Sequence, residues 1–250
     1  MQIEQMKEYK LPKRRQPIFS IVKKIMRLFF RVKVENRAGE LPDKAIIVGN
    51  HSAKSGPVAY ELYYPKFNVT WGAHEMLGNY KSRYLYLRNV FYIQKQGRGK
   101  VYATLKSAFE AIFSKMFYRG IKVLPTYTDM RFLYTVRNSM AVLDDGASLV
   151  IFPEDSNEGY KAELTSAYPG FVMLAEQYYI RTGEDLPIIP VYFHKASKKI
   201  IIDTPETVQT LKEKGLSRAE IVNHFIERIN SLYRENFKDK DKEKELTPTR

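Results

Sequence analysis

The residue best placed for chemistry in this sequence is His51, which separates a short apolar run from a loop of small and polar residues. Residues 45–48 are typical of a strand that is buried on both faces, and Pro57 suits the first turn of a following helix. In open α/β sheets, ligands bind beyond the carboxyl ends of the strands, so His51 is a candidate for chemistry. The alternative is a loop histidine without a function. The residues that favour a loop around it are Gly49, Asn50, Ser52, Ser55 and Gly56.

Composition excludes several classes of protein. The chain has 250 residues, 44% of them hydrophobic, which indicates a folded protein with a sizeable core. It has no cysteine, so disulfides and thiolate metal sites are excluded, and its four histidines lack the spacing of metal ligands. We therefore expect no metal. No uninterrupted apolar run reaches about 18 residues, and residues 1–16 are too polar for a signal peptide, so we expect a cytoplasmic protein without a membrane span.

The net charge of +13 is concentrated in two segments. Residues 1–34 and residues 78–119 each carry a net charge of +8, and the rest of the chain therefore carries −3. Two basic segments on a mildly acidic body predict a local surface for an anionic partner.

Residues 18–34 show the spacing of a basic amphipathic helix. The apolar residues recur every three or four positions, and Lys23, Arg27 and Arg31 form a stripe four residues apart. Such a helix can pack its apolar face on its own domain, or it can lie in an anionic membrane interface. The sequence leaves both interpretations open.

Residues 78–119 interleave aromatic and basic residues, and a strongly amphipathic helix is predicted after the turn at 97–99. Single-stranded nucleic acid can be bound by such a mixture, because aromatic rings stack on bases while cations follow the phosphates. Here, however, the aromatic residues align on one helical face. This favours core packing or membrane contact, and we expect no nucleic acid partner.

The remaining elements alternate between strands and helices, which favours an α/β fold of one domain over residues 18–236. A polar arm, residues 1–17, precedes this domain, and the charged segment 237–250 is expected to be disordered. The predicted strands are 67–73, 120–126, 148–154, 186–193 and 199–203, and the predicted helices are 132–143, 170–180 and 217–236.

Four segments stand out in order along the chain: NHSAKSG (50–56), GIKVLPT (120–126), FPEDSNEG (152–159) and IIPVYF (188–193). Together they resemble the motif blocks of the glycerol-phosphate and lysophosphatidate (1-acylglycerol-3-phosphate) acyltransferases. The resemblance implies a mixed, mainly parallel sheet flanked by helices, with residues 78–119 as a helical insertion that carries the basic and aromatic residues.

The resemblance implies transfer of a fatty acyl group from acyl-CoA or acyl carrier protein to a hydroxyl of a lysophospholipid-like acceptor. No cofactor other than this acyl donor is implied. The resemblance also implies that the protein binds peripherally to the inner face of an anionic membrane and catalyses the transfer there. His51 would be the general base, because a neutral imidazole can take the proton of the attacking hydroxyl. The other implied catalytic residues are Glu154 and Asp155, and the implied substrate-binding residues are Asn50, Lys54, Gly120, Thr126, Phe152, Pro153 and Ser156.

The sequence departs from the family pattern at three places. Gly56 occupies the position of the aspartate that orients the histidine, Thr126 that of one arginine, and Asp155-Ser156-Asn157 that of Gly-Thr-Arg. A weakly active or inactive relative that binds lipid or an acyl carrier is therefore the alternative function. Asp155 is the first candidate to orient His51 in place of the missing acid, and Glu158 is the second. Alternatively, Asp155 merely stabilises its own turn.

Overall fold

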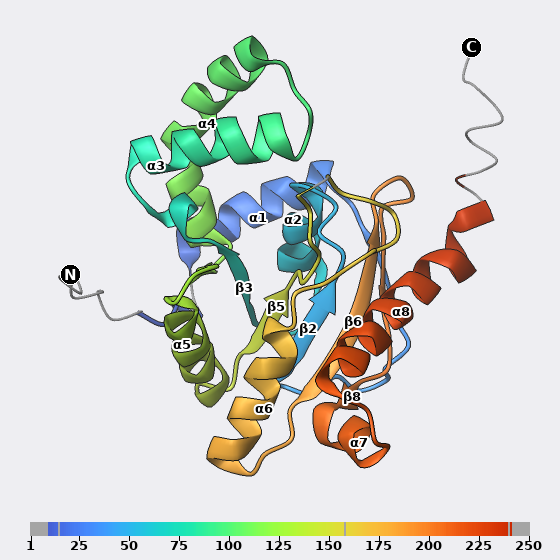
Figure 1. Ribbon diagram of the computed structural model, residues 1–250. Coiled ribbons are helices and arrows are strands. Elements are labelled where there is room, and N and C mark those ends of the chain that lie inside the picture. The colour runs from blue at the N-terminus through green and yellow to red at the C-terminus, as the bar shows by residue number, and fades with distance from the viewer. Residues whose placement is uncertain (1–9, 15, 158, 240, 242–250) are drawn as a thin grey trace.

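One eight-stranded sheet forms the centre of the computed structural model, which describes residues 10–14, 16–157, 159–239 and 241 (Figure 1). Seven strands follow the order β1-β7-β6-β2-β5-β3-β4, and β8 pairs with β6 outside this path. All pairings are parallel except those of β6 with β7 and β8, so the expected mixed, mainly parallel sheet is confirmed. The strands are β1 (Lys33–Asn36), β2 (Ile46–Gly49), β3 (Asn68–Ala73), β4 (Val123–Thr126), β5 (Ser148–Ile151), β6 (Pro187–His194), β7 (Lys199–Ile202) and β8 (Glu206–Thr207).

Helices cover both faces of the sheet, because successive side chains of each strand point to opposite faces. Ile46 and Val48 of β2 join a core with the helices α5, α6, α7 and α8, whereas Ile47 joins a second core against α2 (Figure 1). These helices are α2 (Ser55–Tyr63), α5 (Phe132–Asp144), α6 (Gly170–Thr182), α7 (Val208–Glu213) and α8 (Arg218–Asn236).

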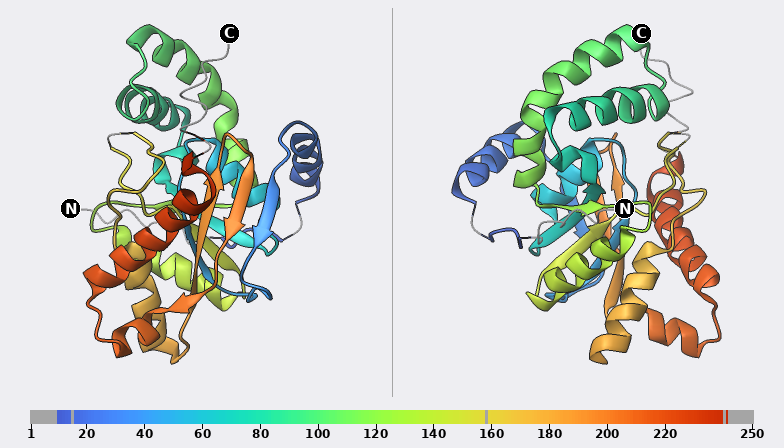
Figure 2. Two further views of the ribbon diagram at one scale, coloured as in Figure 1. Left: turned by 90° about the vertical axis from the view of Figure 1, so that its right-hand side faces the viewer. Right: turned by 60° about the vertical axis from the view of Figure 1, so that its left-hand side comes forward.

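The predicted insertion forms a helical layer beyond the carboxyl edge of the sheet (Figure 2). The helix predicted after residue 99 is α4, and the irregular helices before it were not predicted. They pack on α4 through a buried apolar cluster that includes Leu87, Phe91 and Ala111. Buried Arg83 fastens the layer further, since its Nη2 donates to the carbonyl of Ala111 at 2.8 Å. The elements of the insertion are α3 (Tyr80–Leu85), the π-helix η2 (Tyr86–Gln94) and α4 (Lys100–Gly120), and the 3₁₀ helix η1 (His74–Leu77) directly precedes them.

The N-terminal helix α1 (Pro17–Phe29) is shorter than the predicted 18–34. Residues Lys33–Asn36 instead form β1, which pairs in parallel with β7 at one end of the sheet order. The helix predicted to residue 34 therefore extends too far, because an edge strand of mixed polar residues carries no apolar run that would reveal it.

Helix α1 turns basic as well as apolar side chains toward the body of the protein, where Phe19 and Val22 pack in a small cluster. Lys23 forms an ion pair with the buried Glu61 of α2, and Nε of Arg27 donates to the carbonyl of Leu62 at 3.1 Å. Two residues of the basic stripe therefore face the body of the protein. The apolar side chains that α1 exposes are Ile18, Ile21, Ile25, Leu28 and Phe29.

Gly120 ends α4, and the strand predicted from 120 begins only at Val123. A Cβ on Gly120 would lie 2.2 Å from the ring of Phe19, which belongs to α1. Glycine is therefore required for the close approach of α1 to α4.

Parts of both flanking segments belong to the folded body. Phe237 is 2% exposed in the core, and the Asp241 carboxylate lies 3.0 Å from Nε2 of His194. The predicted disordered segment therefore starts too early, and residues 240 and 242–250 lie outside the described residues. In the arm, Arg14 donates to the carbonyl of Asp145 at 2.5 Å, while residues 1–9 lie outside the description.

Candidate active site

The loop that carries His51 leaves the carboxyl end of β2 and is anchored to β6 by Asn50. The buried amide of Asn50 donates to the carbonyl of Phe193 at 3.0 Å and accepts from its backbone N–H at 2.8 Å. Two left-handed residues follow, Ser52 with φ 44° and Ala53 with φ 52°. Such backbone is uncommon outside glycine and persists where surrounding contacts fix it. The structure thus gives Asn50 a positioning role in the histidine loop, and its expected contact with a substrate stays a prediction.

Gly56 lies against the backbone of His51 where α2 begins. A Cβ at this position would lie 1.9 Å from the carbonyl oxygen of His51 and 2.7 Å from its carbonyl carbon. The loop therefore has no room for a side chain at residue 56. An aspartate placed there would displace the histidine backbone before it could reach the imidazole.

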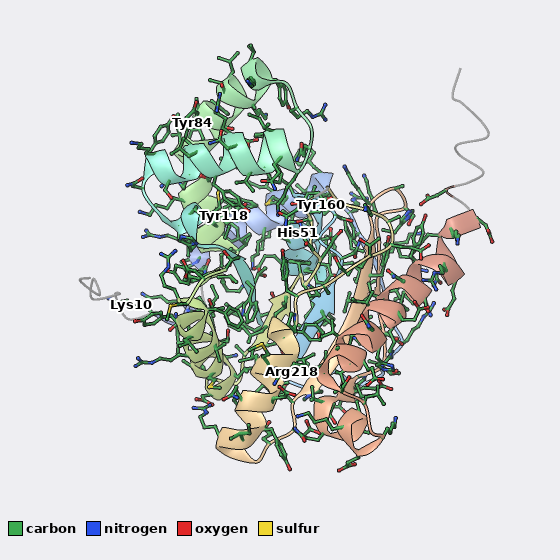
Figure 3. The ribbon with its side chains drawn as sticks, viewed as in Figure 1. Lys10, His51, Tyr84, Tyr118, Tyr160 and Arg218 are labelled. Atoms are coloured by element: carbon green, nitrogen blue, oxygen red, sulfur yellow. The ribbon has the colours of Figure 1, made fainter. Side chains whose placement is uncertain are left out.

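Two aromatic rings enclose the imidazole of His51. The ring of Phe152 meets it edge-on at a centroid distance of 4.9 Å. The ring of Tyr160 stacks on it at 4.9 Å, and Figure 3 labels Tyr160 beside His51. Nδ1 is buried, and among the described residues it has no hydrogen-bond partner of normal geometry. The imidazole is thus positioned by ring packing, without a described side chain that orients Nδ1.

The environment of His51 favours the neutral ring. The pKa of His51 is lowered to about 3, mainly by burial and secondly by the positive charge of Lys95, while the backbone of Ala53 acts in the opposite direction. The imidazole is therefore neutral at pH 7 and can accept a proton. A low pKa also makes the imidazole a weak base, so it has little driving force to remove a proton from a hydroxyl.

Glu154 connects the third motif block to the histidine loop through the backbone. Its buried carboxylate accepts the backbone N–H of His51 at 3.3 Å and that of Lys161 at 3.4 Å. Burial raises the pKa of Glu154, and these two bonds and the charge of Lys95 oppose the rise. Glu154 thus positions the backbone of His51.

Lys54 ties the same loop to the insertion. Its Nζ donates to the hydroxyl of Tyr92 at 2.6 Å and forms an ion pair with Glu110 of α4 at 2.5 Å. It also lies 4.9 Å from the centre of the Phe91 ring. Burial lowers the pKa of Lys54, and the Glu110 carboxylate opposes this effect. Lys54 is therefore engaged in holding α4 over the site.

A cavity of about 470 Å³ opens beside His51 between the sheet and α4. Most of its lining is apolar, and residues from β3, η2, α4 and β4 contribute. Its polar lining includes His51, Lys54 and Lys95 at the loop side. The cavity can hold an apolar chain with a polar group next to the histidine. The apolar lining includes Trp71, Met76, Leu87, Phe91, Phe109, Phe113 and Phe117.

Several residues implied by the resemblance have other contacts. Thr126 Oγ1 donates to the carbonyl of Leu124 in its own strand, and the carbonyl of Pro153 accepts the backbone N–H of Tyr168. Neither residue lines the cavity, nor does Gly120. By contrast, Phe152 packs on His51, and the hydroxyl of buried Ser156 accepts from Lys95.

Asp155 does not contact the imidazole in the described part of the chain. Its carboxylate accepts the backbone N–H of Asn157 at 3.1 Å, two residues ahead. This is the local turn that aspartate commonly stabilises, and it corresponds to the alternative interpretation of Asp155. Glu158, the second candidate, lies outside the described residues.

Two contributors to the site were not recognised as such in the sequence. Tyr160 stacks on His51, and Lys95 brings a positive charge to the same cavity. Lys95 could have been suspected, because it closes a run of aromatic residues in the basic insertion. Tyr160 gave no signal, since only the fold brings its loop against residue 51. Within the described ranges, no cluster of histidine and acidic residues could hold a metal ion.

The outer face of α4 is apolar and exposed, like that of α1. Val101, Leu105 and Met116 are each 65% or more exposed, and Phe109 and Phe113 are exposed while also lining the cavity. Exposed apolar faces of this extent mark sites of interaction with a protein or a membrane. In the part of the chain that the structure describes, no helix is long and apolar enough to cross a membrane.

Comparison by sequence finds no matching family model and no matching curated protein. Among solved structures, the chain is similar to the 1-acyl-sn-glycerophosphate (LPA) acyltransferase PlsC from Thermotoga maritima. The TM-score is 0.51 at 13% sequence identity, and the match covers 88% of this chain and 79% of that chain. At this identity the similarity shows a shared fold.

Proposed function

We propose that this chain is an acyltransferase that moves a fatty acyl group from acyl-CoA or acyl carrier protein to a hydroxyl of a lysophospholipid-like acceptor. One observation carries the proposal: His51 borders an apolar cavity at the carboxyl edge of a sheet whose fold is that of an LPA acyltransferase. The cavity suits an acyl chain, and the histidine suits a base at its polar end.

In the proposed reaction, Nε2 of His51 takes the proton of the acceptor hydroxyl while the oxygen attacks the thioester carbonyl carbon. The C–O bond forms and the C–S bond then breaks. The thiolate leaves with the proton that the imidazole returns, which restores neutral His51. Burial of the ring keeps the imidazole neutral before each turnover.

The protein would act at a membrane surface to which it binds peripherally, on the inner face of an anionic membrane. The exposed apolar faces of α1 and α4 support this part of the proposal. Lipid would reach the cavity along α4, because Phe109 and Phe113 belong to both surfaces. Basic residues near an anionic leaflet contribute about 1 kcal/mol each.

A second candidate function is binding of lipid or an acyl carrier with little or no turnover. It is favoured because no side chain among the described residues pairs with Nδ1 of His51, and because Gly56 leaves no room for an orienting acid. Loss of the orienting acid costs about 10⁴-fold in rate in serine proteases.

Release of free thiol distinguishes the two functions. The purified chain is mixed with acyl-CoA or acyl carrier protein and a panel of lysolipids in vesicles. An acyltransferase releases thiol in proportion to the acylated lipid formed. Binding of lipid without thiol release for any member of the panel would favour the second function.

A further inference from the structure

Lys95 lies where the insertion meets the candidate active site. It directly follows the π-helix η2, and π-helical turns are frequent at functional sites. Its Nζ donates to the hydroxyl of Ser156 at 2.7 Å and lies 5.8 Å from the centre of the Tyr160 ring. Tyr160 in turn stacks on His51. Lys95 therefore places a positive charge at the polar end of the cavity.

The charge of Lys95 is less well balanced than that of the other lysines around the site. Lys54 and Lys122 each pair with a carboxylate, from Glu110 and Glu61 respectively. Among the described residues, no carboxylate lies within ion-pair distance of Lys95 Nζ, whose one hydrogen-bond partner there is the Ser156 hydroxyl.

The nearest acids do not neutralise Lys95 fully. Glu154 and Asp155 act on it at longer range, and they only partly offset the burial that lowers the pKa of Lys95. Both carboxylates also accept hydrogen bonds from backbone N–H groups. A half-buried ammonium group without its own carboxylate favours an added anion.

We propose that Lys95, held in place by the buried hydroxyl of Ser156, forms a subsite for the phosphate or carboxylate group of a single-chain amphiphile whose chain occupies the cavity. The inference rests on the proposed function, because it names the charge that the substrate carries next to His51. Most of the lining that α4 contributes is apolar. Its one carboxylate, from Glu110, pairs with Lys54, so Lys95 supplies the unpaired positive charge at the loop side, and these two regions match the two ends of such a molecule.

The subsite also links substrate charge to the strength of the base. The positive charge of Lys95 disfavours the protonated imidazole of His51. A bound anion cancels this repulsion, so the pKa of His51 rises when the anionic group is in place. His51 thus becomes a better base when the correct substrate is bound.

The test is a binding titration of the full chain, followed by NMR at constant salt, with octyl phosphate below its micelle-forming concentration. Octanol serves as the uncharged chain and inorganic phosphate as the free anion. The variants are Lys95→Met, Lys95→Gln and Lys95→Arg, and Lys100→Met is the matched control because Lys100 is an exposed lysine of the same insertion.

We expect octyl phosphate to bind at least tenfold more weakly to Lys95→Met and Lys95→Gln than to the wild type, Lys95→Arg and Lys100→Met. Octanol should bind all of them equally, which also reports that the cavity is intact. Inorganic phosphate should bind more weakly than octyl phosphate but show the same dependence on Lys95. Lys95→Gln keeps a hydrogen-bond donor for Ser156. If Lys95→Met does not fold, octyl phosphate binding by Lys95→Gln tests the subsite.

Unchanged octyl phosphate binding in the neutral variants would overturn the subsite, and so would an equal loss in Lys100→Met. A dependence on Lys95 that appears only with coenzyme A as the titrant would also overturn it, since the anion would then belong to the donor. No donor is present in the octyl phosphate titration. If the protein binds octyl phosphate as expected but releases no thiol in the transfer assay, the subsite is supported and the proposed acyl transfer is contradicted.

Discussion

The carboxylate of Glu154 accepts a hydrogen bond from the backbone N–H of His51 at 3.3 Å. This bond joins the loop after β5 to the loop after β2 at the carboxyl edge of the sheet. Glu154 therefore binds the backbone of His51, and its carboxylate does not orient the imidazole. The position of His51 depends on Glu154, whereas the protonation of its ring is set mainly by burial.

Replacing Glu154 by alanine removes the acceptor for two backbone N–H groups, those of His51 and Lys161. Unpaired buried donors cost about 1–3 kcal/mol each. We expect Glu154→Ala to lower the free energy of unfolding by about 2 kcal/mol in urea titrations. Glu213→Ala, at an exposed glutamate, is the control. Equal stability of the two variants would show that the carboxylate does not hold the loop.

Substitution of Gly56 is expected to damage the histidine loop. Gly56→Ala places a Cβ against the His51 carbonyl, so the loop must move. We expect a loss of about 2 kcal/mol or more in the free energy of unfolding, together with lower turnover. Gly99→Ala is the matched control, because a Cβ there meets nothing within 4 Å. Gly56→Asp should be at least as damaging, and higher turnover in that variant would contradict the crowding seen here.

The low pKa of His51 predicts an unusual pH dependence. A histidine whose pKa is lowered by folding contributes full stability above the unfolded pKa of about 6.5 and loses it as the pH falls. Between pH 7.5 and 5.5, wild type should therefore lose about 1 kcal/mol more of its free energy of unfolding than His51→Gln. In the same range kcat/KM should show no step due to His51. An activity step near pH 6.5 that His51 causes would contradict a buried, neutral ring.

Buried elements could be predicted from the sequence because their signals are local. The apolar run 45–48 and Ser217 at a helix start predicted β2 and α8, and Ser217 makes the capping box with Glu220. The irregular helices of the insertion were missed, since the π-helix η2 does not follow the helical period of 3.6.

Periodicity also could not show which face of α1 turns inward. It predicted an amphipathic helix, but the partner of Lys23 is the buried Glu61 of α2, more than one element away in the chain. Residue contacts at the site were equally hidden. Asp155 and Tyr160 lie five residues apart, yet only Tyr160 reaches the ring of His51.

The exposed faces of α1 and α4 predict membrane binding. Ile21→Glu combined with Leu105→Glu places charge on both faces without touching the cavity lining. We expect this double variant to lose at least tenfold in co-sedimentation with anionic vesicles, because apolar burial supplies much of the binding. Leu133→Glu, at another exposed leucine, is the control. Retention of wild-type binding by the double variant would assign the faces to some other partner.

The most direct test of the account compares thiol release by wild type, His51→Gln and Asp155→Asn, with acyl-CoA and lysolipid vesicles at one pH. If His51 is the base, His51→Gln should lower kcat at least about a hundredfold, as general-base catalysis contributes 10²–10⁴. Asp155→Asn should stay within about threefold of wild type, because an asparagine can still accept the Asn157 N–H. Thiol release by His51→Gln at the wild-type rate would contradict the central claim that His51 performs the chemistry.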